Sequence, residues 1–237
     1  IEDSCETMFM RRKGRVCGSW GDVACFSTFT VHPIATGVGG LVATDDLELA
    51  VAMKNLANHG ESTWRLSFDG EAPVWVDSGR GEGYVEPGYS YRLTDLEAAL
   101  GLAQIERWPE IAAAYQRNAG HLSEALSDLT DHLQLPSARP GSEHWFWRYG
   151  ILVKDLSRHP RNGLLDHLNG AGVPARYLYP ILNQPVYTSR YGELEAACPV
   201  AARINRSGLV LGTHSGLGTA DIDRYAEAIH SFFDRER

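Results

Sequence analysis

The sequence predicts an α/β fold, and two observations lead to this expectation. Short apolar runs of β-forming residues alternate along the chain with segments whose apolar residues recur at helical spacing. The 237 residues are 43 % hydrophobic and 22 % charged, which are ordinary values for a globular protein. Such a length suits one large domain or two modest ones, and the segment PSARPG at 136–141 is the best candidate boundary.

Two β-forming runs and a helix are expected early in the chain. The runs cover residues 22–28 and 40–44, and a glycine-rich turn at 36–40 separates them. A helix is expected over 45–58, where apolar side chains recur at helical spacing and Asp45 or Asp46 can serve as N-cap. Residues 59–90 are rich in Gly, Pro and Trp without a regular pattern, which predicts a long loop of the kind that often carries function.

A capping box, Thr94-x-x-Glu97, opens the next expected helix. Pro109 should kink or restart that helix, which then continues over 111–129. Beyond the linker, strands are expected over 145–153, 173–179 and 209–211, and helices over 162–169, 199–206 and 219–233. The bulky residues at 145–147 invite a sugar-stacking interpretation, but alternating bulky side chains on a strand are more typical of core packing.

Charge and cysteine spacing exclude several classes of protein. The 22 Lys and Arg against 30 Asp and Glu give a net charge of −8, which argues against non-specific binding to nucleic-acid phosphates. No apolar stretch is long enough to span a bilayer. The cysteines lack the close pairs of a zinc or iron–sulfur site, so we expect no metal, and free thiols in a reducing cytoplasm. They are Cys5, Cys17, Cys25 and Cys198.

Polar residues near the ends of the expected strands are the candidates for chemistry. Glu2 and Asp3 form an acidic pair, a Gly-Ser-Trp-Gly-Asp turn spans 18–22, Ser27 ends the next strand, and His32 follows five residues later. Taken singly, each is equally explained as a turn or loop residue. Their order and spacing carry more information than any one of them.

This order resembles the DegT/DnrJ/StrS family of pyridoxal-phosphate enzymes, which comprises nucleotide-sugar aminotransferases and related dehydratases. The resemblance is carried by IEDSCE (1–6), GRVCGSWGD (14–22), FSTFTVHPIATGVGG (26–40), NHG (58–60) and GYSYRLTDLEAALGLAQIER (88–107). It extends more loosely to the C-terminus. Because Ile1 reads as the end of a buried strand and is not Met, we expect the chain to be about the last two-thirds of a family member.

The resemblance implies the fold-type I aminotransferase architecture. Residues 1–135 would form part of the large cofactor-binding domain with its connecting helix, and residues 142–237 the small C-terminal α/β domain. Family members are homodimers with sites shared across the interface, and they act on nucleotide sugars. We therefore expect a cytoplasmic homodimer with a nucleotide-sugar substrate and with neither nucleic acid nor membrane as a partner.

The resemblance also implies four cofactor-binding residues. Asp3 stands where the family has the carboxylate that keeps the pyridoxal ring nitrogen protonated, which the ring needs to act as an electron sink. Glu6 stands where many members have Gln beside the ring hydroxyl. Ser27 matches the serine that binds the phosphate, and a hydroxyl does so without adding charge. Ser90 stands where members usually have an Asn that reaches the phosphate from the second subunit.

His32 occupies the position of the lysine that binds the cofactor covalently in the family's aminotransferases. An imidazole cannot form that bond, because the bond needs a primary amine. Lys13, Lys54 and Lys154 are the only lysines, and none lies near the pattern. We therefore expect no covalent cofactor unless a segment outside this chain supplies a lysine.

One branch of the family carries the same substitution, and it implies a reaction. The 3-dehydratases of nucleotide-linked 4-keto-6-deoxyhexoses have His for Lys, and an acid–Cys–acid opening like that of Asp3 to Glu6. They use pyridoxamine phosphate, and the histidine acts as a base while the C3 hydroxyl leaves. By this resemblance His32 would be the catalytic base. Some members hold a two-iron cluster through four cysteines, but only Cys5 has a counterpart here, so we expect no cluster.

Two alternatives stay open from the sequence. Residues 30–33 (TVHP) depart from the sequence motif that is usual in the known dehydratases. The chain could instead be a sugar aminotransferase that takes its amine from glutamate, with His32 only assisting. It could also be a family member that has lost its chemistry.

Overall fold

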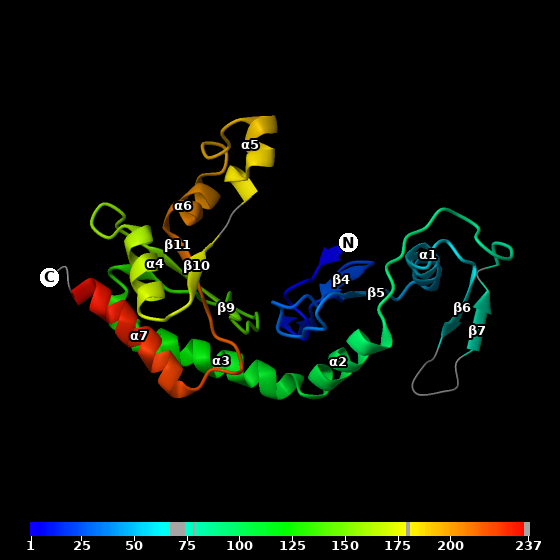
Figure 1. The fold of residues 1–237 in the computed structure, drawn as a ribbon, viewed down its shortest axis with the longest axis horizontal. Helices are drawn as coiled ribbons and strands as arrows, with labels where there is room; N and C mark the ends of the chain where they lie inside the picture. Colours follow the sequence, from blue (N-terminus) through cyan, green and yellow to red (C-terminus); the bar gives the residue numbers. More distant parts are fainter. Residues whose placement is uncertain (67–73, 78, 179–180, 235–237) are drawn as a thin grey trace. The chain divides into compact units, whose positions relative to one another are not determined.

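The computed structural model describes residues 1–66, 74–77, 79–178 and 181–234 (Figure 1). By its internal contacts the chain divides into two compact units, Ile1–Arg107 and Trp108–Arg237. The boundary expected at 136–141, between the large and small domains of the family, stays a prediction. No helix among the described residues is long and apolar enough to cross a membrane.

A three-stranded sheet is the centre of the first unit. It is ordered β1 (Glu2–Asp3), β4 (Ala24–Ser27) and β5 (Gly40–Ala43), which confirms the two expected runs. β1 runs parallel to β4 and β5 antiparallel to it, with Asp3 opposite Cys25 and Ser27 opposite Gly40. A small hairpin, β2 (Arg11–Arg12) and β3 (Arg15–Val16), lies between β1 and β4 in the chain. The parallel pair places the ends of β1 and β4 at one edge of the sheet.

Helix α1 (Leu47–Ala57) follows β5 and begins where the sequence indicated. Asp46 is the N-cap, and its Oδ1 accepts the backbone N–H of Leu49 at 3.1 Å. The long loop expected over 59–90 is partly wrong, because β6 (Thr63–Leu66) and β7 (Val74–Asp77) pair as an antiparallel hairpin. Both strands carry aromatic and aliphatic residues that favour pairing, which the surrounding Gly and Pro obscured.

Helix α2 (Asp95–Glu106) confirms the capping box. The backbone N–H of Thr94 donates to Glu97 Oε2 at 3.0 Å, and the Thr94 hydroxyl contacts the same carboxylate. This hydroxyl contact holds the pKa of Glu97 below its ordinary value. Pro109 lies in the first turn of α3 (Trp108–Ala125), so the helix restarts at the proline as expected.

The second unit is an antiparallel sheet covered by helices. Its strands are ordered β10 (Ala175–Tyr177), β11 (Gly208–Gly212), β9 (Arg148–Val153) and β8 (Leu133–Gln134). Its helices are α3, α4 (Arg161–Gly170), α5 (Pro185–Tyr191), α6 (Pro199–Ser207) and α7 (Thr219–Asp234), with short 3₁₀ turns at Ser127–Leu129 and Ile181–Asn183. Side chains of β9, β11, α3, α4 and α7 form one continuous core. The strand expected from residue 145 begins only at Arg148, but Trp145 and Trp147 before it are buried, as core packing predicted.

Two histidine–aspartate pairs bind α7 to α3 and the turn after it, and Figure 1 shows α3 and α7 side by side. His121 Nε2 lies 2.6 Å from Asp223 Oδ1, and His230 Nε2 lies 3.0 Å from Asp128 Oδ1. Partial burial lowers the pKa of His230, but the hydrogen bonds to Asp128 and to Ala226 O, together with the charges of Asp128 and Asp234, outweigh burial and raise the pKa above its ordinary value. The protonated form of His230 is therefore favoured by folding.

We expect the Asp128–His230 pair to stabilise the second unit mainly at acidic pH. A histidine with a raised pKa contributes its full stability below its unfolded pKa and loses it as pH rises through the folded pKa. Asp128→Asn should therefore lower the melting temperature more at pH 6 than at pH 8.5, by the equivalent of about 0.5 kcal/mol for so exposed a pair. Thermal melts by circular dichroism measure this, with Asp131→Asn as a control. Equal losses at both pH values would contradict the expectation.

Candidate active site

The ends of β1 and β4 bring two predicted residues to the same edge of the sheet. Asp3 ends β1 and Ser27 ends β4, and ligands in α/β proteins commonly bind at such carboxyl ends of parallel strands. Asp3 is exposed, and its Oδ1 accepts the backbone N–H of Cys5 at 3.2 Å. The Ser27 hydroxyl accepts the backbone N–H of Phe29 at 3.3 Å, so its own proton is available to another acceptor.

Glu2, the neighbour of Asp3, performs a different task that the sequence did not reveal. Its carboxylate accepts the N–H of Gly18 at 2.6 Å, the N–H of Trp20 at 2.9 Å and the Ser4 hydroxyl at 2.8 Å. Burial raises the pKa of Glu2, but these donors outweigh burial and lower it overall. Successive side chains point to opposite faces of a strand, so Glu2 anchors the 18–22 turn while Asp3 faces the other way. The sequence features that could have indicated this role of Glu2 are the acidic pair Glu2–Asp3 and the Gly-Ser-Trp-Gly-Asp turn at 18–22.

Cys5 and Asp3 influence each other electrostatically. A hydrogen bond with Asp3, partial burial and the charge of Asp3 together raise the pKa of the Cys5 thiol to about 11. The same hydrogen bond lowers the pKa of Asp3. Cys5 is therefore a protonated donor and no nucleophile, and Asp3 is an exposed anion that can pair with a cationic ring nitrogen.

His32 is held in one orientation by the chain around it. Its backbone N–H donates to Phe29 O at 2.9 Å, and its Nδ1 lies 3.2 Å from Ser27 O. A carbonyl oxygen only accepts, so Nδ1 carries the proton and Nε2 presents the lone pair of the neutral ring. The ring of Phe29 also meets the imidazole edge to face, with centroids 6.4 Å apart, a contact that sequence reasoning missed.

Glu6 lies near Nε2 of the His32 imidazole. Its Oε1 is 3.8 Å from His32 Nε2, and the side chains are 47 % and 11 % exposed respectively. The carboxylate therefore stabilises an imidazolium once Nε2 has taken up a proton. The sequence placed Glu6 beside a cofactor hydroxyl, and the structure adds a direct pairing with His32.

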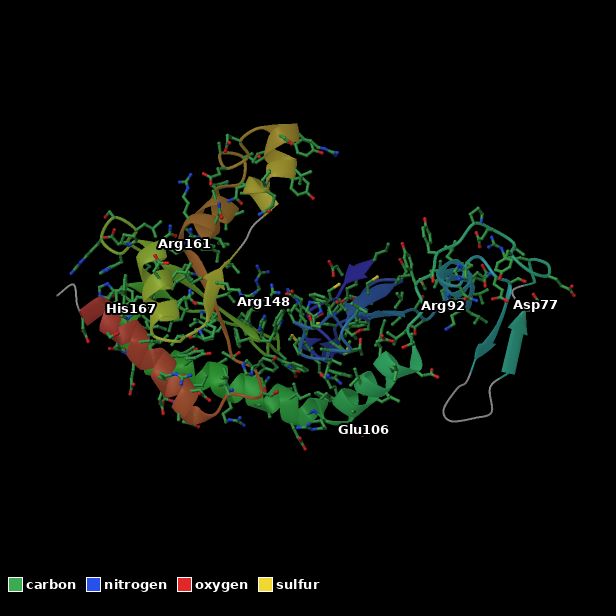
Figure 2. All side chains as sticks on the ribbon, viewed as in Figure 1. Asp77, Arg92, Glu106, Arg148, Arg161 and His167 are labelled. Atoms are coloured by element: carbon green, nitrogen blue, oxygen red, sulfur yellow. The ribbon has the colours of Figure 1, made fainter. Side chains whose placement is uncertain are left out.

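Ser90 makes its described contacts elsewhere in the first unit. It forms an isolated antiparallel bridge with Asn58, and its hydroxyl accepts from Arg92 Nη2 at 3.2 Å. Figure 2 shows Arg92 on the segment that leads into α2. Short contacts thus connect Ser27, His32 and Glu6, and the parallel pairing of β1 with β4 brings Asp3 to the same end of the sheet. The expected role of Ser90 toward a second subunit stays a prediction.

This donor set fits a pyridoxal-type cofactor held without a covalent bond. Asp3 supplies a carboxylate with a lowered pKa for a protonated ring nitrogen, and Ser27 supplies a neutral hydroxyl for a phosphate. The lysines serve other positions: Lys13 sits in the turn between β2 and β3, Lys54 is in α1, and Lys154 donates to Thr130 O. The expected place of His32 at the position of the family's lysine stays a prediction.

The sequence profile of the DegT/DnrJ/EryC1/StrS aminotransferase family matches residues 1–230. The chain belongs to this family. GDP-perosamine synthase of Caulobacter vibrioides is 32 % identical over 97 % of the chain and 57 % of its own length. The dTDP-4-dehydro-2,6-dideoxy-D-glucose 3-dehydratase of Saccharopolyspora spinosa is 28 % identical over 98 % of the chain and 53 % of its own length. The chain thus spans little more than half the length of these curated relatives.

A solved structure matches the fold of this family member. The E. coli GDP-4-keto-6-deoxy-D-mannose-3-dehydratase with bound hydrated PLP superposes with a TM-score of 0.80 at 22 % identity, over 96 % of this chain and 59 % of that one. The predictions of the family and of its fold-type I architecture are confirmed.

The thiol of Cys5 provides a direct test of the electrostatics at Asp3. The raised pKa keeps Cys5 protonated near pH 8, and only the thiolate reacts with iodoacetamide. Asp3→Asn removes the charge and should speed alkylation of Cys5 by about tenfold, the effect of roughly one pKa unit. Mass spectrometry of peptides measures both rates. The exposed Cys198 is the internal control, and equal Cys5 rates in the two proteins would contradict the assignment.

Proposed function

We propose that this chain belongs to a 3-dehydratase of nucleotide-linked 4-keto-6-deoxy sugars, with His32 as the proton-transferring base. The observation that carries the proposal is the fixed imidazole at the position of the family's lysine, with Nδ1 bound to Ser27 O and Nε2 facing Glu6. An imidazole in this arrangement accepts and returns protons at neutral pH but cannot form the covalent link of an aminotransferase.

Each residue of the site has a definite task in this proposal. Bound pyridoxamine phosphate supplies the amine that condenses with the sugar ketone and the ring that takes up electrons. Asp3 holds the ring nitrogen protonated, and Ser27 donates to the phosphate. His32 Nε2 would take up a proton from the C4′ methylene of the cofactor, the Glu6 carboxylate would stabilise the imidazolium, and this proton would leave with the C3 hydroxyl as water.

The relatives support two outcomes for the sugar. The S. spinosa relative is a 3-dehydratase, which favours loss of an oxygen. The C. vibrioides relative is a perosamine synthase with 32 % identity, which favours transfer of an amine, with glutamate as donor, as the second candidate. In both, the substrate is a nucleotide sugar. We also propose a homodimer in which Ser90 reaches the phosphate bound to the partner subunit, and a cytoplasmic location.

The two outcomes differ in the mass of the product. The protein is incubated with pyridoxamine phosphate, glutamate and a 4-keto-6-deoxy nucleotide sugar, and the sugar is analysed by mass spectrometry. We expect a product that has lost the C3 oxygen. His32→Asn should lower the rate by about a hundredfold or more, whereas His214→Asn, an exposed histidine of the other unit, should stay within about twofold. An aminated product would overturn the dehydratase proposal.

Borohydride reduction tests the absence of a covalent cofactor without any turnover. The protein is loaded with pyridoxal phosphate, reduced and measured as an intact mass. We expect no added mass, since His32 lacks a primary amine, and one reduced cofactor on the His32→Lys variant. An adduct on the unchanged protein, mapped to another lysine, would contradict the assignment of His32.

A further inference from the structure

We propose that Gln104 of α2 is the residue that positions the His32 loop. This inference rests on the proposed role of His32, but the effect of Gln104 on the loop can be measured without any turnover. The loop runs from Thr28 to Gly39, between β4 and β5, and Gln104 reaches it from 69 residues further along the chain.

Gln104 satisfies both backbone groups of one loop residue. Its Nε2 donates to Ala35 O at 2.5 Å, and Ala35 N–H donates to its Oε1 at 3.1 Å. The side-chain amide therefore supplies the donor and the acceptor that a neighbouring β-strand would otherwise offer to Ala35. Ala35 is three residues from His32, with the buried Ile34 between them.

The rest of the loop is held by hydrogen bonds between its own two arms, among them Thr28 N–H to Gly39 O at 3.0 Å and Thr30 N–H to Gly37 O at 3.1 Å. Thr36 N–H donates to Thr28 O at 2.7 Å, and the two threonine hydroxyls lie 2.7 Å apart in the interior. At the tip, His32 N–H donates to Phe29 O. Pro33 follows His32 and has no N–H to offer. The Ala35–Gln104 pair adds a contact of a different kind, because it joins the loop near its tip to α2.

A second contact on the same face of α2 supports this position. Gly101 lies one turn before Gln104, and residues three apart share a helix face. A Cβ at Gly101 would come within 3.1 Å of Thr36 Cγ2. The Thr36 hydroxyl is itself held by Thr28 and by Val38 O, so Thr36 has little freedom to move away. Glycine at 101 therefore lets α2 approach closely enough for Gln104 to reach Ala35.

The consequence is that α2 sets the direction in which His32 Nε2 points. The orientation of the imidazole is set by its contact with Ser27 O at the start of the loop and by the position of the backbone near Ala35. Releasing Ala35 lets the tip move relative to β4, and misplacing a catalytic group by about 1 Å costs about a hundredfold in rate.

Two variants of Gln104 separate hydrogen bonding from packing. Gln104→Met has a similar size but neither donates nor accepts, whereas Gln104→Glu keeps the acceptor for Ala35 N–H and loses the donor. Glu106→Met, at the exposed end of the same helix (Figure 2), is the matched control. Amide hydrogen exchange and the chemical shifts of the His32 ring are followed by NMR in all four proteins, and melting curves confirm that each is folded.

We expect the Ala35 amide of Gln104→Met to exchange about tenfold faster or more, as the loss of its hydrogen-bond partner implies. The chemical shifts of the His32 ring should change with it, Gln104→Glu should show a smaller change, and Glu106→Met should match the unchanged protein. If Gln104→Met does not fold, Gln104→Glu is compared with Glu106→Met in its place. Unaltered exchange and unaltered His32 ring shifts in the Gln104 variants would overturn the proposal.

Turnover distinguishes this inference from the proposed function. In an active protein, Gln104→Met should lower kcat by about tenfold or more with KM for the nucleotide sugar nearly constant, because the loop and not the sugar site is disturbed. If exchange rises in Gln104→Met but no protein turns over the sugar, the positioning role holds and the proposed function fails. If turnover is normal in the unchanged protein and equal in Gln104→Met, the positioning role fails alone.

Discussion

The hydrogen bond between His32 Nδ1 and Ser27 O is the interaction on which the candidate site depends. It joins the last residue of β4 to the loop that follows, and it decides which ring nitrogen carries a proton. With Nδ1 committed to a carbonyl, Nε2 is the atom that would exchange protons under the proposed function, and Glu6, 3.8 Å away, would stabilise the positive charge. A ring free to rotate would present either nitrogen and would spend part of its time unable to act as a base.

The strand geometry of β1 gives two adjacent carboxylates opposite tasks. Glu2 is saturated by three donors from the 18–22 turn and Ser4, so its charge is already used within the fold. The carboxylate of Asp3 is exposed. The hydrogen bonds described for it come from the backbone N–H and the thiol of Cys5. One residue therefore builds the edge of the sheet, and the other is available to a ligand. Because the two side chains leave opposite faces, neither task disturbs the other.

Local signals were read correctly from the sequence, and tertiary contacts were not. The Asp46 cap, the Thr94 capping box and the strands around the glycine turn follow from neighbouring residues, which is why they were predictable. Gly39 in that turn has φ +148°, a backbone conformation that side chains rarely adopt, as the glycine-rich sequence predicted. The β6–β7 hairpin was missed because Gly and Pro around it imitate a loop. The Gln104–Ala35 pair was beyond reach, since nothing local indicates which side chain will meet a loop 69 residues away.

The proposed replacement of an amine by an imidazole changes what the remaining residues would have to do. A lysine can both retain a pyridoxal cofactor and move protons, whereas a histidine can only move protons. Under the proposed function, retention would fall to noncovalent contacts, of which this chain's described residues offer a carboxylate at Asp3 and a hydroxyl at Ser27. In a chain of net charge −8, binding an anionic phosphate through neutral donors needs several of them at once. The contribution proposed for Ser90 from a second subunit would therefore matter more than in a site whose cofactor is covalently tethered.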